Sequence, residues 1–474
     1  SSCTLQDFRK CLGRGQAIKK NKVVLDMSNN QINHKVPLSG RLSYGLTDGC
    51  GNLLYCIIGS YLLYFYTDVF GLSVATAGAI LLFTRLLDAI DAPIWGFIVD
   101  HTKSKYGQSR PYFLWLCVPF AVFMWLTFTT PALSGTTKII YAVVTYILAG
   151  IFYTGIQTAI TSILPNLTRR PGERVILNTF RMVGGNIGAF ICMTFTLPLV
   201  AFFGEGNEQK GFSYTLAFFG IIAIVLFIVA FKNLREVNVE KIKSIPIKDS
   251  VKAIKGNWPW ILVVIANLIF WIALTIRLST VVYYCQYYLG DKSLTVFING
   301  IMLVQVIGMI SIPLLVKRFN KYGTMILGFI LVAGGHIGIF FVGTNIELMI
   351  VFWIIASLGQ GIACSMPFAM LSDTVDFGEW KTGIRASGFL TAIGSAFCIK
   401  AGSGIGGFIP AAVMNLFGYV PNAVQSSTAL FGIQFVFTWL PAIIFLCGII
   451  PMLFYRKYEQ NENNILLDLA KRNS

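Results

Sequence analysis

The stretch RLLDAIDAPIWGFIVDHTKSKYGQSRPYFLW, residues 85–115, holds the two features that decide the fold. Its first part completes an apolar run over 74–99, and a helix needs roughly 20 such residues to cross a bilayer. A short basic segment, HTKSKYGQSRP at 101–111, follows directly. Basic residues accumulate in the cytoplasmic connectors of membrane proteins. The stretch therefore predicts a membrane-spanning helix that ends in the cytoplasm.

The composition of the whole chain agrees with this prediction. Of 474 residues, 55% are hydrophobic and only 12% are charged, whereas a soluble domain carries about 25% charged residues. This excludes a soluble enzyme, a secreted disulfide scaffold and a disordered protein. The net charge of +16 is explained by basic cytoplasmic segments, so no nucleic-acid partner is expected. Ten cysteines without a CxxC pair and only three histidines predict no metal site and no cofactor besides a coupling ion.

Twelve apolar runs are predicted to span the membrane. The first six lie near 43–66, 74–99, 112–131, 138–163, 178–203 and 213–232, and the second six near 259–286, 294–316, 324–343, 347–371, 386–415 and 429–454. If the N-terminus is inside, the inner connectors hold 18 basic residues and the outer ones three. This bias predicts that both termini are cytoplasmic.

These runs predict two six-helix bundles. The expected parts are a cytoplasmic segment at 1–41, the bundles 42–232 and 259–456, a cytoplasmic loop between them at 233–258, and a cytoplasmic tail at 457–474. Residues 1–26 have no apolar core, so they are not a signal peptide. We expect them to be foreign to the natural protein, which would then start at Met27.

The two predicted bundles echo one another. YFYTDVFGLS (64–73) is placed like YYCQYYLGDKS (283–293), and KSKYGQS (103–109) is placed like KRFNKYGTM (317–325). Two six-helix repeats around a central cytoplasmic loop are typical of major-facilitator transporters.

Several ionisable residues lie inside the predicted spans, where each charge is costly. Arg85, Asp88 and Asp91 are spaced three apart and so lie along one helical face. Two carboxylates on one face repel each other and favour a shared proton or cation. Asp88 and Asp91 are therefore candidates for coupling transport to a cation. The alternative for Arg85 and Asp88 is an internal ion pair.

Three basic residues, Arg181, Arg277 and Lys400, come from three other spans. If they converge, they offer donors to sugar hydroxyls or to a carboxylate. The alternative is that they pair with the embedded aspartates. A charge network that gates the transporter is expected from Arg85, Asp373, Asp376 and Arg385.

Longer motifs resemble the glycoside–pentoside–hexuronide:cation symporter family. The motifs are SYLLYFYTDVFGLS (60–73), the stretch at 85–115, YTGIQTAITSILPNLT (153–168), NTFRMVGGNIG (178–188), SDTVDFGEWKTGIR (372–385) and IKAGSGIGGF (399–408). The likeness extends from Leu42 to Tyr458. It implies a major-facilitator fold, a sugar or glycoside substrate, and symport with H+, Na+ or Li+.

The resemblance also implies roles for single residues. Asp88 matches a family carboxylate of the cation site, and Thr154 matches a polar neighbour of that site. Arg181 and Lys400 match basic residues near the sugar and the network of helix charges.

The chain departs from the family pattern at three positions. Ala92 stands where a second cation-site carboxylate is expected, and Gln157 and Asn52 replace aspartates that bind sugar, with Asp48 one turn before Asn52. The lost carboxylate favours H+ coupling through Asp88 or Asp91. Coupling to Na+ and uncoupled facilitation or exchange are the alternatives. The residues expected to bind the substrate are Asp48, Asn52, Gln157, Arg181, Arg277 and Lys400. Their neutral amides and embedded basic groups favour an anionic or pentose-type sugar.

The sequence therefore predicts an all-α membrane protein with the major-facilitator fold and twelve transmembrane helices in two six-helix pseudo-repeats. It is expected to import a glycoside, pentoside or hexuronide together with H+ by alternating access. A lysolipid carrier is a second alternative, and a sugar sensor that does not transport is the least favoured. No enzyme is expected, because the chain has no nucleophile elbow, HExxH pair or phosphate-binding loop. The expected setting is the cell membrane, with a sugar, a coupling cation and the bilayer as partners and a monomeric state.

Overall fold

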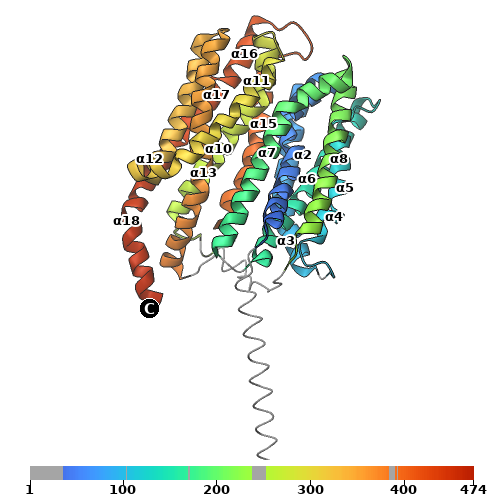
Figure 1. Cartoon of the computed structure of the whole chain (residues 1–474). Helices are drawn as coiled ribbons and strands as arrows, with labels where there is room; N and C mark the ends of the chain where they lie inside the picture. Colours follow the sequence, from blue (N-terminus) through green and yellow to red (C-terminus); the bar gives the residue numbers. More distant parts are fainter. Residues whose placement is uncertain are drawn as a thin grey trace, which may run out of the picture.

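The computed structural model describes residues 36–473 except 103, 169–170, 237–251, 253, 384–389 and 392. Helices α2 to α8 form one group and helices α10 to α18 a second group beside it (Figure 1). We call them the first half and the second half. The first half consists of α2 (Leu38–Tyr64), η1 (Phe65–Val69), α3 (Val74–His101), α4 (Pro111–Trp115), α5 (Cys117–Thr127), α6 (Gly135–Leu167), α7 (Pro171–Gly204) and α8 (Glu208–Asn233).

The second half has the same helical character. It consists of α10 (Trp258–Tyr283), η2 (Tyr284–Tyr288), α11 (Leu294–Ile301), η3 (Met302–Val304), α12 (Gln305–Val342), α13 (Ile346–Thr382), η4 (Ile393–Phe397), α15 (Cys398–Leu416), α16 (Ser427–Phe437), α17 (Trp439–Cys447) and α18 (Ile449–Asn473). The segments η1, η2 and η4 are π-helical, and η3 is a 3₁₀ turn.

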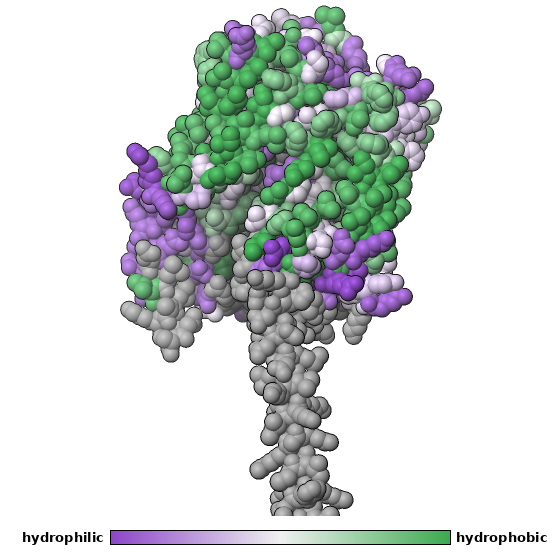
Figure 2. Space-filling view, viewed as in Figure 1, coloured by the Kyte–Doolittle hydropathy of each residue, from purple (hydrophilic) through white to green (hydrophobic). Residues whose placement is uncertain are grey.

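The predicted all-helical membrane fold is confirmed. Helices cover most of every predicted span, although the last residues of the span near 112–131 are not helical and several residues at the start of the span near 386–415 lie outside the described part of the chain. Eight of the described helices are long and apolar enough to cross a membrane, so the number of twelve crossings stays a prediction. Two predicted spans share α12, which turns sharply at Asn320, where φ is 60°. On the face shown in Figure 2, hydrophobic residues cover much of the surface and hydrophilic ones gather toward its two ends.

Corresponding contacts support the internal repeat. In both halves the first long helix, α2 or α10, runs into a five-residue π-helical turn. In the first half, the Glu236 carboxylate accepts hydrogen bonds from the backbone N–H groups of Gln108, Ser109 and Arg110 at 2.7–2.9 Å. In the second half, the Glu459 carboxylate accepts from the backbone N–H groups of the equivalent loop, at Lys321 and Tyr322. Glu236 follows the end of α8, Glu459 lies inside α18, and Lys321 and Tyr322 follow the turn at Asn320 in α12. Each half thus ties a turn after its second predicted span to a residue in or after its last helix.

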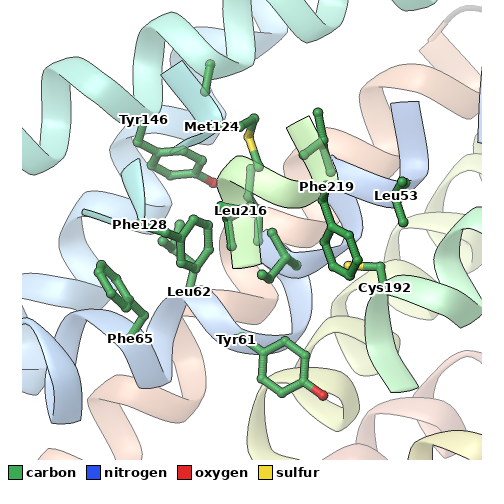
Figure 3. Packing of buried hydrophobic residues seen from close by; sticks show 14 of the residues in the cluster. Leu53, Tyr61, Leu62, Phe65, Met124, Phe128, Tyr146, Cys192, Leu216 and Phe219 are labelled. Atoms are coloured by element: carbon green, nitrogen blue, oxygen red, sulfur yellow. The ribbon is translucent and has the colours of Figure 1, made fainter. Parts of the chain in front are cut away.

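The interior of the first half is a core of buried aromatic and aliphatic side chains. Leu62, Phe65, Phe128 and Leu216 are fully buried and come from three separate stretches of the chain (Figure 3). The rings of Phe65 and Phe128 lie 5.0 Å apart between centroids. Such packing makes the first half a firm support for the polar side chains described below.

We call the end of the molecule that carries η1 and η2 the outer end, and its centre is Asp68. The Tyr419 hydroxyl donates to both carboxylate oxygens of Asp68 at 2.9 Å, and the Tyr287 hydroxyl donates to Oδ1. The Asn422 amide donates to the Asp68 backbone carbonyl at 2.6 Å. Asp68 belongs to the first half and Tyr287, Tyr419 and Asn422 belong to the second, so these bonds hold the two halves together. The Thr67 hydroxyl, in the first half, also donates to Asp68 Oδ2 at 2.6 Å.

Three further contacts complete this outer closure. The hydroxyls of Thr67 and Tyr283 are 2.8 Å apart, and Lys292 Nζ lies 2.5 Å from Glu208 Oε1 and 2.7 Å from the Tyr64 hydroxyl. Burial lowers the pKa of Lys292. The Glu208 carboxylate acts in the opposite direction, because it stabilises the charged ammonium group. The structure is therefore a state in which the halves are closed at the outer end.

Helices α2 and α7 pack against each other at glycines, and a substitution at one of these glycines tests the contact. A Cβ at Gly188 would lie 2.1 Å from the backbone oxygen of Gly49, so Gly188→Ala is expected to force the helices apart. The expected loss is about 1–3 kcal/mol, measured as a lower unfolding temperature in detergent. Gly59→Ala on α2 is the control, since a Cβ there meets nothing within 4 Å. Equal unfolding temperatures of the two variants would contradict this contact.

Candidate functional site

A polar cluster lies between α2 and α6. Gln157 Nε2 donates to Asp48 Oδ1 at 3.0 Å and to the Tyr153 hydroxyl at 3.1 Å. The Tyr153 hydroxyl in turn donates to Asn52 Oδ1 at 3.3 Å. The residues meet because 48 and 52 are one turn apart on α2, as are 153 and 157 on the facing helix α6. Three predicted substrate-binding residues, Asp48, Asn52 and Gln157, are thus brought together, with side chains that bind hydroxyl groups.

A second cluster surrounds the Lys400 ammonium. Lys400 Nζ donates to Asp91 Oδ1 at 2.9 Å, to the Asp88 backbone oxygen at 2.5 Å and to Thr154 Oγ1 at 3.0 Å. Lys400 lies on α15, just after the π-helical turn η4, and such turns occur frequently at functional sites. The second carboxylate oxygen of Asp91 is buried and has no hydrogen-bond partner among the described residues. All three predicted coupling residues therefore meet, with Lys400 among them.

Arg85 and Asp88 form the internal ion pair that was one of the two sequence-based alternatives. Arg85 Nη1 lies 3.2 Å from Asp88 Oδ2, and both side chains are buried. The guanidinium also lies over the Tyr55 ring, 4.7 Å from its centroid. Tyr55 stacks on Tyr153 with 3.6 Å between ring centroids. The pair at Asp88 is therefore linked through two aromatic rings to the cluster between α2 and α6.

The glycine at position 150 leaves room for the Asp88 side chain. A Cβ at Gly150 on α6 would lie 2.6 Å from Asp88 Oδ1. Since real Cβ atoms do not approach so closely, a larger residue at 150 would force the Asp88 carboxylate or the helix α6 to shift.

The other predicted basic residues lie apart from Lys400. Arg277 is fully buried in the second half, where it donates to Gln360 and Ser357. Arg181 on α7 is half-buried, and its buried Nε has no hydrogen-bond partner among the described residues. The structure records no contact between any two of the three.

The predicted gating residues are only partly placed. Asp373 pairs with Lys321 at 2.6 Å, whereas Arg85 contacts Asp88. Asp376 lies further along α13 and is half-buried. Arg385 lies outside the described residues.

Sequence reasoning missed several residues that the structure places in polar clusters. Gln305 and Gln360 lie in apolar runs and belong to none of the motifs quoted above. Asp68 lies two residues beyond the predicted span 43–66, so the search for charges inside spans passed over it. The echo of 64–73 at 283–293 was the available signal, since it contains both Asp68 and its partner Tyr287.

Two clusters of polar and charged groups inside an apolar helical bundle, with a closure between the halves at one end, define a membrane transporter. The family model described as MFS/sugar transport protein matches residues 43–457. The chain belongs to this family, as its motifs predicted, and it is a transporter and not an enzyme.

Known relatives are similar over nearly the whole chain. The isoprimeverose transporter of Lactiplantibacillus pentosus is 41% identical, over 93% of this chain and 92% of that protein. The uncharacterized symporter YnaJ of Bacillus subtilis (strain 168) is 33% identical, over 92% and 96%. The putative sulfoquinovose importer of Escherichia coli (strain K12) is 31% identical, over 94% and 96%.

Solved structures show the same fold. An inward-facing, unoccupied bacterial homologue of the human lysosomal transporter Spinster has a TM-score of 0.65 at 11% identity, over 91% of this chain and 97% of that one. The nucleoside transporter NupG has a TM-score of 0.61 at 14% identity, over 86% and 98%. At such identities the likeness concerns the fold alone.

Proposed function

We propose that this transporter imports a pentose-containing glycoside together with H+. The observation that carries H+ coupling is the position of the Lys400 ammonium, which binds Asp91 Oδ1, the Asp88 carbonyl and Thr154 Oγ1. Cations such as Na+ bind to this kind of oxygen set. A Na+ ion would have to displace a tethered positive charge, whereas a proton needs only a free carboxylate oxygen.

Asp91 offers such an oxygen. Its Oδ2 is buried and has no hydrogen-bond partner among the described residues, whereas the Asp88 carboxylate pairs with Arg85. A proton on Asp91 removes the counter-charge of Lys400 and lets α15 separate from α3. Binding of H+ thereby changes the free energy of moving one half against the other, which coupled transport requires.

The proposed substrate follows from the cluster between α2 and α6. The amides of Asn52 and Gln157 offer both donors and acceptors, and the carboxylate of Asp48 accepts from a hydroxyl. Together with the stacked Tyr55 and Tyr153, this cluster suits a neutral sugar. The similarity to an isoprimeverose transporter favours a glycoside of a pentose. We further propose that the protein acts as a monomer in the cell membrane with both termini cytoplasmic.

The test is external pH in a lightly buffered suspension of cells that make the protein. Addition of isoprimeverose is expected to raise the external pH with and without Na+, because each sugar enters with a proton. Asp91→Asn should abolish this signal, whereas Asp291→Asn should keep it, because Asp291 is an exposed carboxylate outside the site. Entry of labelled sugar without alkalinisation, or a requirement for Na+, would contradict H+ coupling.

A further inference from the structure

The second half contains a buried positive charge with an unusual set of partners. Arg277 on α10 is fully buried, and its guanidinium lies over the Trp353 ring, 3.9 Å from the centroid. Its two terminal nitrogens donate to Gln360 Oε1 and, at 2.9 Å, to Ser357 Oγ, both on α13. In the described part of the chain no carboxylate pairs with it. An arginine held by neutral partners inside a membrane protein needs a role other than an ion pair.

These bonds fix the orientation of two side-chain amides, those of Gln360 and Gln305, which are hydrogen-bonded in series. Arginine has donors only, so Gln360 must turn its oxygen toward Arg277. The Gln360 amide nitrogen then faces the other way and donates to Gln305 Oε1 at 3.1 Å. Because the Gln305 oxygen is occupied as an acceptor, its NH₂ group is left to donate. Gln360 is 4% exposed, and Gln305 is half-buried, so the series runs from a buried cation to a more accessible donor.

Gln305 also stands at a break in its helix. The 3₁₀ turn η3 interrupts the predicted span 294–316, and Gln305 is the first residue of α12 after this turn. Short 3₁₀ stretches inside long helices often mark functional hinges. Interrupted transmembrane helices commonly form the substrate sites of secondary transporters.

Arg277 and Gln360 lie on helices of the second half that correspond to the helices of the first cluster. Asp48 and Gln157 lie on α2 and α6, which are the first and fourth predicted spans of their half. Arg277 and Gln360 lie on α10 and α13, the first and fourth predicted spans of the other half. The same pair of helices thus carries a polar cluster in each half.

We propose that the Gln305 amide donates a hydrogen bond to a hydroxyl oxygen of the transported sugar, and that Arg277 is a positioning residue that acts through Gln360. This inference rests on the proposed function, since it assigns a second contact to the same sugar. The first half then binds one part of the glycoside through Asn52 and Gln157, and the second half binds another.

The experiment is counterflow of labelled isoprimeverose in proteoliposomes, which needs no coupling ion. Gln305→Met keeps the length of the side chain and removes the donor. It is expected to raise KM about tenfold, the effect of one lost hydrogen bond, with the maximal rate changed less than twofold. Arg277→Lys, which cannot hold Gln360 with a fork of donors, should raise KM in the same way. Gln434→Met, at a half-buried glutamine on α16, is the control and should change neither.

A series of monodeoxy isoprimeveroses separates contact with the sugar from a structural role. One analogue should bind the wild type about tenfold more weakly than the parent sugar and bind Gln305→Met as well as the parent does. Gln305→Glu, which replaces the donor by an acceptor, should raise KM more than Gln305→Met. Unchanged KM in the variants, or the same preference among analogues in Gln305→Met and wild type, would overturn the inference. Failure of the wild-type protein to transport isoprimeverose would instead overturn the proposed function, and this inference with it.

Discussion

Lys400→Ala is expected to abolish uphill accumulation of sugar and to lower the stability of the protein. The substitution leaves the Asp91 carboxylate without the ammonium that lies 2.9 Å away. Removal of one partner of a buried ion pair costs about 3–5 kcal/mol. Since these side chains are 14% and 13% exposed, we expect a loss of ~2 kcal/mol. The measurements are the unfolding temperature in detergent and sugar accumulation in proteoliposomes with an imposed pH gradient.

The double variant Lys400→Ala, Asp91→Ala separates stability from coupling. It removes both charges, so its unfolding temperature and its counterflow should return close to the wild-type values. Accumulation should stay absent, because Asp91, the proposed proton-binding group, has been removed. Lys210→Ala, at an exposed lysine, is the control and should behave as wild type. Accumulation by the double variant would show that the proton binds elsewhere.

The second large effect is expected from Asp68→Asn at the outer closure. The substitution replaces the charged acceptor of the Tyr287 and Tyr419 hydroxyls by a neutral amide. A hydrogen bond to a charged group contributes about 1.5–3 kcal/mol, and about 1.4 kcal/mol changes a population tenfold. The state that is open at the outer end should therefore become at least about tenfold more populated.

Accessibility of position 67 measures this shift. Thr67 is fully buried against Tyr283 of the other half, so Thr67→Cys should react with a membrane-impermeant maleimide only when the halves separate. Adding Asp68→Asn should speed labelling from outside about tenfold, whereas adding Asp291→Asn should leave it unchanged. The chain without the new cysteine provides the background. Equal labelling rates with and without Asp68→Asn would show that these bonds do not hold the halves closed.

Much of the fold follows from local properties of the sequence. The apolar runs locate the helices because a spanning helix needs about 20 apolar residues. The basic connectors locate the breaks between helices because basic residues gather in the cytoplasmic loops. The break between the two predicted spans in α12 was located by its polar residues KRFNKYG at 317–323. The π-helical turns η1 and η2 were not predicted, because a π turn depends on the packing of the surrounding helices and not on local composition.

The candidate site was predictable only in part. Asp88, Asp91 and Lys400 could be selected because charges inside apolar runs are rare and costly. The sequence left open how they pair, since Lys400 and Asp91 are 309 residues apart and only the fold brings them together. Gln305 and Gln360 carry no charge, so nothing in their surroundings distinguishes them from amides that merely join helices.

The contacts of Glu236 and Glu459 have a consequence for biosynthesis. The backbone N–H groups at 108–110 find their acceptor only when the end of the first half has been made. Those at 321 and 322 depend on the end of the second half. Because a chain is made from its N-terminus and its parts fold as units, the first half can be complete before the second half has left the ribosome. Insertion of this transporter into the membrane is then a sequence of two separate assembly steps, each finished by a single carboxylate.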